Sequence, residues 1–313
     1  MKEFTVNQND SGQRIDKFLQ KTVKKLPLSL MYKYFRLKRI KINGKAAKQD
    51  SRLEPNDKIQ LYINDEFFDA EEKPDEFLTL DGKIDVVYED ENVLLVNKPF
   101  GLIVHSDSNE TRNTLINQVK AYLHTKGEYD PVKENSFAPA LCNRLDRNTG
   151  GIVIIAKNAE TLRQLNDDIK EKNIGKFYLL RIIGKMSPKD GELKSYLLKD
   201  NEKNLVKSVK SLSNGAKTAV TLYKTVKCLD DGTSIVEAEL KTGRTHQIRV
   251  QFADAGHPLL GDGKYGNNAV NKRFGFKYQL LFSYKLVFPS DLSGKLQYLA
   301  GKVFYADVPN YLK

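Results

Sequence analysis

Residues 141–157 read LCNRLDRNTGGIVIIAK, in which a charged turn runs directly into an apolar segment. Residues 152–156 are mostly β-branched and preceded by Gly, which is typical of a buried β-strand. The preceding Thr149-Gly150-Gly151 predicts a turn. Asp146 therefore stands just ahead of a strand, where the edge of a sheet would hold its carboxylate on a rigid scaffold.

Two arginines, Arg144 and Arg147, flank Asp146. Positive charge within a few ångströms favours the ionised form of a carboxylate. Guanidinium groups also match phosphate oxygens, so the two arginines could bind a phosphate-bearing ligand. An R-x-D-R string equally fits a structural ion pair in a surface turn, because such pairs are common. The rest of the chain has to decide between a site and a surface pair.

The composition is that of a basic protein long enough for two domains. The 313 residues include 51 Lys or Arg and 40 Asp or Glu, a net charge of +11. Such a balance favours a polyanionic partner. The two cysteines, Cys142 and Cys228, have no paired spacing, so a disulfide framework or a zinc knuckle is not expected.

No targeting or cofactor signature stands out in the chain. The N-terminus MKEFTVNQND has no apolar signal region, and no stretch approaches about 18 uninterrupted apolar residues. We therefore expect a cytoplasmic protein without a membrane partner. No G-x-x-x-x-G-K-[ST] signature is present, so we expect no nucleotide cofactor, and we predict no other cofactor and no metal.

Residues 1–63 predict a small α/β unit. Alternation at 2–6 indicates an edge strand, and apolar positions from Ile15 to Val23 have helical spacing. Ser29 is a plausible N-cap of a second helix. The turn Asn43-Gly44 after an alternating stretch predicts a hairpin, and a further strand is expected at 59–63.

The same unit is strongly basic. Between Arg14 and Lys48 there are twelve Lys or Arg residues and a single acid, Asp16. A charged helix face is usually only solvated, but an imbalance of this size favours contact with phosphates.

Residues 64–83 differ sharply in composition from the unit before them. Eight acids face only Lys73 and Lys83, with Pro74 in the middle. Self-repulsion should keep such a segment extended, so we interpret it as an acidic linker and place the domain boundary here. Its three aromatic residues, Phe67, Phe68 and Phe77, could dock it onto one of the domains.

Residues 84–313 predict a second domain rich in strands. A hairpin over 84–96 leads to a loop at 97–102, and a helix follows Thr114. Asn158 is expected to cap another helix. Strands are predicted at 176–183, 219–226, 234–240 and, as two or three strands, over 278–288 and 295–308. Strands outnumber helices and hairpins recur, so we predict an α+β fold with a largely antiparallel mixed sheet and flanking helices.

Four stretches in this domain carry candidate functional groups. They are a Lys98-Pro99 loop, the turn with Asp146, Tyr178 on a strand, and residues 243–249, GRTHQIR. Each has an ordinary explanation by itself. His246 could be a core histidine with satisfied hydrogen bonds, Tyr178 could be strand packing, and Arg249 could lie on the surface.

Together, and in this order, the stretches resemble the RluA family of pseudouridine synthases. That family has an H-R-L-D-x-x-T-S-G motif, here residues 143–151, an N-K-P-x-G-L-x-V-H loop, here 97–105, and the G-R-T-H-Q-I-R segment. The basic N-terminal unit looks like the small αL-type RNA-binding domain shared with a small-subunit ribosomal protein. The sequence departs from the family pattern at Asn143, where His is usual, and at Gly150, where Ser is usual.

The resemblance implies a pseudouridine synthase fold over residues 84–313 and assigns the site. Asp146 would be the catalytic carboxylate, Arg249 its ion-pair partner, and Tyr178 a group that stacks on or hydrogen-bonds the target base. Arg144 would bind backbone phosphate or fill the space that the extruded base leaves in the stack of RNA bases. We expect further RNA contacts from a set of basic residues in both domains: Lys33, Arg36, Lys38, Arg39, Lys41, Arg147, Arg244 and His246.

The implied reaction breaks the N1–C1′ bond of a uridine, turns the base and joins C5 to C1′. It needs no redox cofactor. Asp146 could act as nucleophile or as base at the sugar. We therefore expect an isomerase acting on structured RNA, most plausibly large-subunit ribosomal RNA, and a monomer. A catalytically idle RNA-binding factor for ribosome assembly is the alternative. A glycosidase fits poorly, because only one carboxylate stands out.

Overall fold

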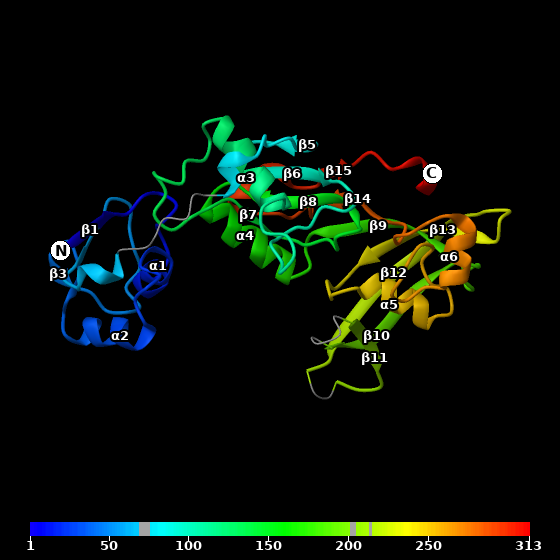
Figure 1. Cartoon of the computed structure of the whole chain (residues 1–313), viewed down its shortest axis with the longest axis horizontal. Helices are drawn as coiled ribbons and strands as arrows, with labels where there is room; N and C mark the ends of the chain where they lie inside the picture. Colours follow the sequence, from blue (N-terminus) through cyan, green and yellow to red (C-terminus); the bar gives the residue numbers. More distant parts are fainter. Residues whose placement is uncertain (69–75, 201–204, 213–214) are drawn as a thin grey trace. The chain divides into compact units, whose positions relative to one another are not determined.

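A computed structural model describes residues 1–68, 76–200, 205–212 and 215–313 (Figure 1). They form two compact units: one of Met1–Lys83, Ile116–Ala140 and Ala156–Leu162, the other of Ile84–Leu115, Leu141–Ile155 and Arg163–Lys313. The centre of the predicted acidic linker, residues 69–75, lies outside the described residues. In the part of the chain that is described, no helix has both the length and the apolar character needed to cross a membrane.

The N-terminal part of the first unit packs two helices on a small sheet. Its sheet has the strand order β1-β4-β2-β3, and Phe18, Met31 and Ile59 lie in its core. Asn43 and Gly44 have φ of 50° and 79°, which confirms the predicted hairpin turn. The elements are β1 (Lys2–Thr5), α1 (Ile15–Thr22), α2 (Leu28–Arg36), β2 (Ile40–Ile42), β3 (Lys45–Ala46) and β4 (Lys58–Leu61).

One prediction in this unit is wrong. Ser29 does not cap α2, because the helix begins at Leu28 and Pro27 is its N-cap residue. Proline has its φ fixed near the helical value and no N–H to satisfy, so it suits a helix start without a side-chain cap.

The described ends of the linker are held by aromatic side chains. They contain two short 3₁₀ helices, η1 (Asp65–Phe67) and η2 (Glu76–Thr79). Phe67 and Phe68 pack against the core of the N-terminal sheet. Phe77 is buried, and its ring lies 5.9 Å from that of His124 on α3 (Leu115–Thr125). Both ends of the linker therefore dock within the first unit.

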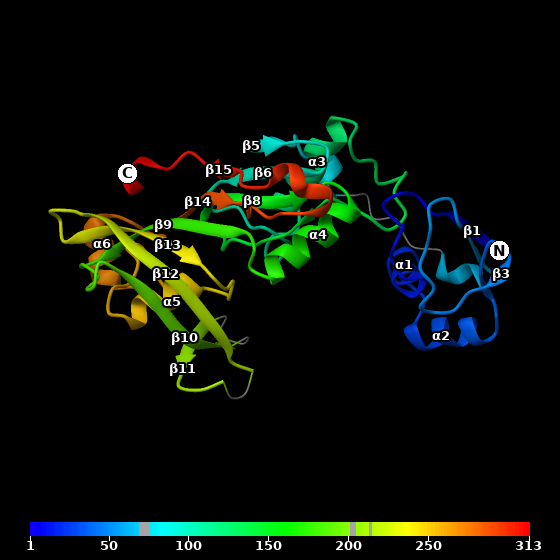
Figure 2. The same ribbon diagram turned by 180° about the vertical axis from the view of Figure 1, so that it is seen from behind.

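The larger sheet has eleven strands in the main order β11-β10-β12-β13-β9-β14-β8-β6-β5, with β15 beside β14 and β7 beside β8 (Figures 1 and 2). β8 and β14 run parallel, whereas β9 to β13 pair antiparallel with their neighbours. The predicted largely antiparallel mixed sheet is confirmed. The strands are β5 (Val86–Glu89), β6 (Val93–Lys98), β7 (Ala140–Leu141), β8 (Gly150–Ala156), β9 (Gly175–Ile183), β10 (Asp190–Asp200), β11 (Leu205–Val209), β12 (Lys217–Cys228), β13 (Thr233–Leu240), β14 (Leu281–Val287) and β15 (Val303–Tyr305).

The remaining helices are α4 (Ala159–Lys170), α5 (Gln247–Asp254), α6 (Asn268–Phe274), η3 (Gly294–Leu299) and η4 (Asn310–Leu312). Figures 1 and 2 show α5 beside β10. Asn158 caps α4 as predicted, its Oδ1 accepting from Thr161 N at 2.9 Å. η3 occupies residues that were expected to be a strand.

The predicted turn at Gly150-Gly151 is also wrong, because both glycines belong to the buried strand β8. Gly151 has φ of 108°, and a Cβ there would lie 2.1 Å from the carbonyl oxygen of Ser283 on β14. A side chain would push the strands apart, so glycine is what lets β8 approach β14 directly after the Asp146 loop.

Candidate active site

Asp146 lies in the loop between β7 and β8. Within this loop Thr149 N donates to the Asp146 carbonyl at 3.0 Å. The Asn143 side chain accepts from Ile154 N at 2.8 Å and lies 3.4 Å from Ile152 O. After β7 the main chain leaves β8, and the side-chain amide of Asn143 takes the place of the main-chain pairing there. Asn143 therefore fixes the start of the loop that carries Asp146.

Lys98, at the end of β6, ties a second loop to this one. It is fully buried, and its Nζ donates to the carbonyls of Pro99, Leu102 and Arg147 at 2.9, 2.7 and 3.0 Å. Burial lowers the pKa of Lys98 to about 7, and the charge of Asp146 opposes that shift. Arg147, the residue after Asp146, is therefore linked by its carbonyl oxygen and Lys98 to the loop after β6.

Helix α5 is anchored by two buried amides. Gln247 Nε2 donates to Val220 O on β12 at 3.0 Å, and Gln251 Oε1 accepts from Thr221 Oγ1 at 2.7 Å. Residues four apart share one face of a helix, so Arg249, two positions from each, projects from the other side.

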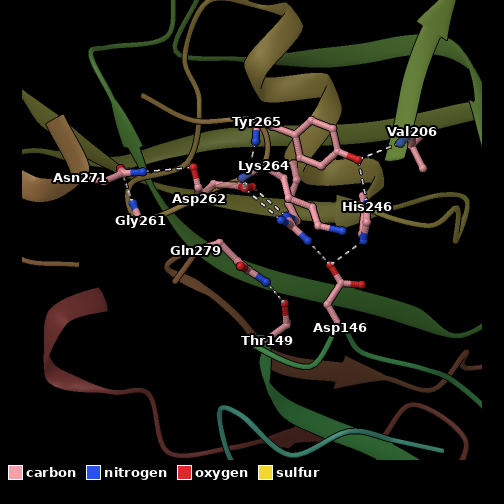
Figure 3. Close-up of polar contacts among 11 residues, drawn as sticks. Asp146, Thr149, Val206, His246, Gly261, Asp262, Lys264, Tyr265, Asn271 and Gln279 are labelled. Carbon is pink, nitrogen blue, oxygen red and sulfur yellow. Dashed lines mark hydrogen bonds and ion pairs between the residues drawn. The ribbon is translucent and has the colours of Figure 1, made fainter. Parts of the chain in front are cut away.

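Arg249 divides its guanidinium between two carboxylates (Figure 3). Nη1 donates to Asp146 Oδ2 at 2.8 Å, and Nε and Nη2 donate to Asp262 at 2.7 and 2.9 Å. Burial opposes its charge, but the bonds and charges of Asp262 and Asp146 outweigh it and raise the pKa of Arg249. The expected pairing of Arg249 with Asp146 is present, and it connects to a second, fully buried aspartate.

Asp262 is itself fixed by backbone groups. Its Oδ1 accepts from the N–H groups of Lys264 and Tyr265 at 2.9 and 3.1 Å. Burial alone would raise the pKa of Asp262, but its bonds to Arg249 and to these N–H groups hold the pKa below the ordinary value. The Asn271 side chain on α6 donates to the Asp262 carbonyl at 3.0 Å, so this loop is also held by α6.

His246, directly ahead of α5, faces the same oxygen of Asp146. Its Nε2 lies 3.9 Å from Asp146 Oδ2, and its Nδ1 lies 2.8 Å from the hydroxyl of Tyr265, which also accepts from Val206 N at 2.9 Å. The His246 side chain is 9% exposed. Burial is the main cause that lowers the pKa of His246, so the imidazole is neutral near neutral pH.

Tyr178 lies on β9, opposite Ser283 on β14 and Ala238 on β13. It is buried. Burial and the charge of Asp146 raise the pKa of Tyr178 to about 12, against a hydrogen bond to Ser283 that lowers it. The phenol therefore keeps its proton near neutral pH and can donate a hydrogen bond.

Asp146, Tyr178, His246 and Arg249 line one cavity of about 1300 Å³. That exceeds the roughly 300–1,000 Å³ of a typical small-molecule pocket, so it has room for more than a single nucleoside. Of the lining residues that the structure describes, the only acids are Asp107 and Asp146. The cations are Arg144, Arg147, Lys170, Lys172, Lys176, Lys199, Lys241, Arg244, Arg249, Lys264 and Lys277.

The structure brings Asp146, Tyr178, Arg249 and Arg144 together around this cavity. Arg144 is exposed and, among the described residues, has no ion-pair partner. The other predicted residues of this domain line the cavity too. Arg147 pairs with Asp107 at 2.9 Å, Arg244 Nε donates to Thr218 O at 3.0 Å, and His246 is half-buried beside Asp146. The basic set of the N-terminal domain lies elsewhere, on α2, β2 and their connection: Lys33, Arg36, Lys38, Arg39 and Lys41.

Sequence reasoning missed three features of this site. Asp262 and Tyr265 were assigned no role, although Gly261-Asp262 follows the GRTHQIR segment closely. The bonding of Lys98 depends on three backbone carbonyls, which no motif encodes. The cavity lysines are scattered over residues 170–277, so no local charge run reveals them.

Gly150, a departure from the family pattern, has a packing explanation. A Cβ at this position would lie 2.9 Å from the ring of Phe100 and 3.0 Å from that of Phe282. These two rings stack with centroids 6.0 Å apart. Glycine leaves room for both rings under the loop.

Comparison with known proteins identifies the family of the chain. The family model for RNA pseudouridylate synthase matches residues 92–254, more than half of the chain. An RNA pseudouridine synthase of Mycoplasma capricolum is 35% identical over 97% of this chain and 96% of its own length. The ribosomal large subunit pseudouridine synthase C of Rickettsia felis is 32% identical over 94% of each chain.

A solved structure shares the fold. Human RNA pseudouridylate synthase domain containing 4 superposes with a TM-score of 0.56, at 21% identity over 73% of this chain and 90% of its own. The chain therefore belongs to the RNA pseudouridylate synthase family and is an isomerase that converts uridine in RNA to pseudouridine.

Proposed function

We propose that the protein isomerises specific uridines of large-subunit ribosomal RNA, with Asp146 as the catalytic carboxylate. One observation carries the role of Asp146. Its Oδ2 is held by the buried Arg249 at 2.8 Å, whereas Oδ1 has no hydrogen-bond partner among the described residues. The side chain is 28% exposed, so a fixed, ionised carboxylate presents one free oxygen to the cavity.

The chemistry requires such a group at the sugar. The N1–C1′ bond breaks, the base turns, C5 bonds to C1′, the hydrogen on C5 leaves as a proton, and N1 gains one. A free carboxylate oxygen can attack C1′ as a nucleophile or remove a proton as a base. Both roles use the carboxylate form of Asp146, which the hydrogen bond from Arg249 Nη1 at 2.8 Å orients.

The remaining cavity residues suit a flipped nucleotide. Tyr178 keeps its phenolic proton and presents both a ring and a donor, so we propose that it contacts the target base. Arg144, exposed and without an ion-pair partner among the described residues, is proposed to bind phosphate or to fill the space that the base leaves. Extruding a base costs a few kcal/mol, which stacking and phosphate contacts can offset.

We propose that residues 1–63 form a separate RNA-binding domain, joined by the linker 64–83 to the catalytic domain 84–313. Lys33, Arg36, Lys38 and Arg39 are exposed, and Lys41 lies over the ring of Tyr62 at 5.0 Å. None of the five forms an ion pair with a described residue, so their charges are available to phosphates. Arg147 and Arg244 are proposed to contact RNA at the cavity. The side chain of His246 is only 9% exposed, which favours a role inside the site.

The choice of large-subunit ribosomal RNA is supported by the names of relatives, such as the large subunit synthase of Rickettsia felis. A cytoplasmic location and a monomeric state stay predictions. The test incubates the purified protein with unmodified large-subunit rRNA, small-subunit rRNA and transfer RNA, and quantifies pseudouridine in each. Conversion confined to the large-subunit rRNA is expected. Conversion of transfer RNA alone would contradict the substrate. Tight binding without conversion of any RNA would favour the idle assembly factor.

A further inference from the structure

His246 has a place in the site that RNA binding does not explain. Its Nε2 and Arg249 Nη1 approach the same oxygen of Asp146, at 3.9 and 2.8 Å. Figure 3 shows His246 between the Tyr265 hydroxyl and the Asp146 carboxylate.

We propose that His246 is a positioning residue: Tyr265 fixes its proton on Nε2, and this N–H, directed at Asp146 Oδ2 from 3.9 Å, acts with the hydrogen bond from Arg249 to keep Oδ1 as the oxygen that reacts. This inference rests on the proposed catalytic role of Asp146 and specifies it further.

The hydrogen bonds around Tyr265 determine the position of the proton. The Tyr265 hydroxyl accepts from Val206 N at 2.9 Å and lies 2.8 Å from His246 Nδ1. Nδ1 is the only acceptor within reach of this hydroxyl in the described part of the chain. The hydroxyl therefore donates to Nδ1, and in a neutral imidazole the proton is then on Nε2. Nε2 is the atom that faces Asp146.

Tyr265 also orients the other donor. The Arg249 guanidinium carbon lies 5.2 Å from the centroid of the Tyr265 ring, within the range of a cation–π contact. Tyr265 N donates to Asp262, the carboxylate that binds the remaining nitrogens of Arg249. A single tyrosine thus contacts both groups that approach Asp146 Oδ2.

The backbone at His246 supports a functional reason for its position. His246 has φ of 52° and ψ of 19°, the left-handed region, at the N-cap of α5, and its side chain makes no capping bond. A non-glycine residue there stores strain, which persists where the surroundings require it and is common at functional sites. Here the strain places the imidazole between Tyr265 and Asp146.

The groups that face the imidazole keep it neutral. Burial lowers the pKa of His246 most, the positive charges of Arg249 and Lys264 add to this, and Asp146 and Asp262 oppose it. Tyr265 is neutral, because burial raises the pKa of its phenol. Protonation at acid pH would make Nδ1 a donor and disrupt its bond from Tyr265.

The experiment uses two neutral amides of different reach at position 246. The Asn amide reaches about as far as Nδ1 and can contact Tyr265 but not Asp146, and Asn tolerates left-handed φ. The Gln amide reaches about as far as Nε2 and can donate to Asp146. With saturating RNA, His246→Asn should lower turnover by about tenfold or more, since small misplacements of a reacting group have large effects. His246→Gln should keep most of the activity, and RNA affinity should change little in both.

The acid limb of the turnover profile is a second readout. Wild type should lose activity as pH falls through the pKa of His246, and His246→Gln should retain activity to lower pH. Turnover in His246→Asn equal to wild type would overturn the inference and leave the proposed function intact. Parallel losses of affinity and turnover in both variants would also overturn it, because they indicate an RNA-contact residue.

A third measurement does not depend on activity. The chain has four histidines, so ¹⁵N NMR of the imidazoles is tractable, and the signals of His246 are those that disappear in His246→Asn. The wild-type protein near neutral pH should show the proton on Nε2, and Tyr265→Phe should shift population towards the other tautomer. A wild-type Nδ1–H tautomer would contradict the inference whether or not the protein modifies RNA.

Discussion

Charge is used in opposite ways in two regions of this molecule. On α2 and the connection that follows it, Lys33, Arg36, Lys38 and Arg39 are exposed. In the active site, Arg249 and Asp262 are 5% and 0% exposed, and each of their charged atoms has a named partner. Exposed charges are screened and act as a sum. Buried charges act individually, because a missing partner cannot be replaced by water.

The contrast predicts two classes of variant. Changes in the buried cluster should affect turnover or folding and be insensitive to salt. Changes on the basic domain should affect RNA affinity, depend on salt and be roughly additive. The contrast would be contradicted by a variant of the buried cluster that changes mainly RNA affinity. It would also be contradicted by a variant of the basic domain that changes mainly turnover.

The largest effect is expected for Asp146→Asn. The amide is nearly isosteric but has neither the charge nor the basicity for chemistry at the sugar, so turnover should fall by about a thousandfold or more. RNA affinity should be retained or rise slightly, because one negative charge is gone. Single-turnover assays, with affinity and thermal unfolding measured alongside, check this. Residual turnover within about tenfold of wild type would exclude Asp146 as the catalytic group.

Arg249→Lys should have the next largest effect on activity. Lysine lacks the planar fork that reaches Asp146 and Asp262 at once, so turnover should drop by about a hundredfold while RNA affinity changes little. A matched control is Arg144→Lys, which keeps a cation at an exposed position and should lose much less turnover. Equal losses of turnover and affinity in Arg249→Lys would mean that Arg249 binds RNA instead.

Removing the charge of Arg249 should also lower the stability of the protein, because Arg249 and Asp262 form a buried ion pair. Arg249→Met leaves Asp262 buried without its cation and should lower the free energy of unfolding by about 3–5 kcal/mol. The double variant Arg249→Met with Asp262→Asn should regain part of that loss, since no uncompensated charge remains. Urea unfolding of the three proteins tests this. Strictly additive losses would mean that the two side chains are not coupled.

The basic domain should give a moderate, salt-dependent effect. Replacing Lys33, Arg36, Lys38 and Arg39 together by Gln should weaken RNA binding and reduce the slope of log affinity against log salt by about 0.7–0.9 for each phosphate that is no longer bound. Turnover with saturating RNA should stay near wild type. The control changes four exposed lysines that do not line the cavity, Lys185, Lys189, Lys224 and Lys227, and should alter the slope less. Equal changes of slope would leave net charge, rather than this surface, as the cause.

The smallest predicted effect concerns stability at acid pH. The pKa of His246 is lower in the folded protein than its ordinary 6.5. Below about pH 6.5 the unfolded chain therefore binds the proton first, and the free energy of unfolding falls with pH until the folded-state pKa is passed. Wild type should lose more stability than His246→Gln between about pH 7 and pH 5. The other histidines cancel in this difference, so equal pH dependence would contradict a buried neutral imidazole.

Much of the fold could be predicted from the sequence where turn residues or a regular pattern of apolar residues mark an element. The hairpin at Asn43-Gly44 and the apolar strand β8 are examples. β10 and β11 were missed, because both carry charged residues along faces open to solvent. α5 was missed for a different reason. It is buried on more than one side, and its buried residues include Gln247, Arg249 and Gln251, so it shows no apolar periodicity.

The residues of the site also separate into those that could be predicted from the sequence and those that could not. Asp146 and Arg249 stand in short motifs and Tyr178 on a predicted strand, so all three could be named from the sequence. The partners that orient them could not, because Asp262 and Tyr265 meet Arg249 only through the fold of the loop after α5. Asn143 and Gly150 were recognised as departures from a pattern, but their reasons are a side-chain bond to β8 and the packing of two phenylalanine rings.

The central claim, that Asp146 makes this protein an rRNA pseudouridine synthase, is tested most directly in cells. Pseudouridines are mapped in the ribosomal RNA of a strain that lacks the gene, and the strain is then supplied with wild type or Asp146→Asn at equal protein levels. Specific positions of the large-subunit rRNA should lose pseudouridine in the deletion, regain it with wild type and remain uridine with Asp146→Asn. Restoration by Asp146→Asn would contradict the catalytic role of this carboxylate, and an unchanged map in the deletion strain would contradict the proposed substrate.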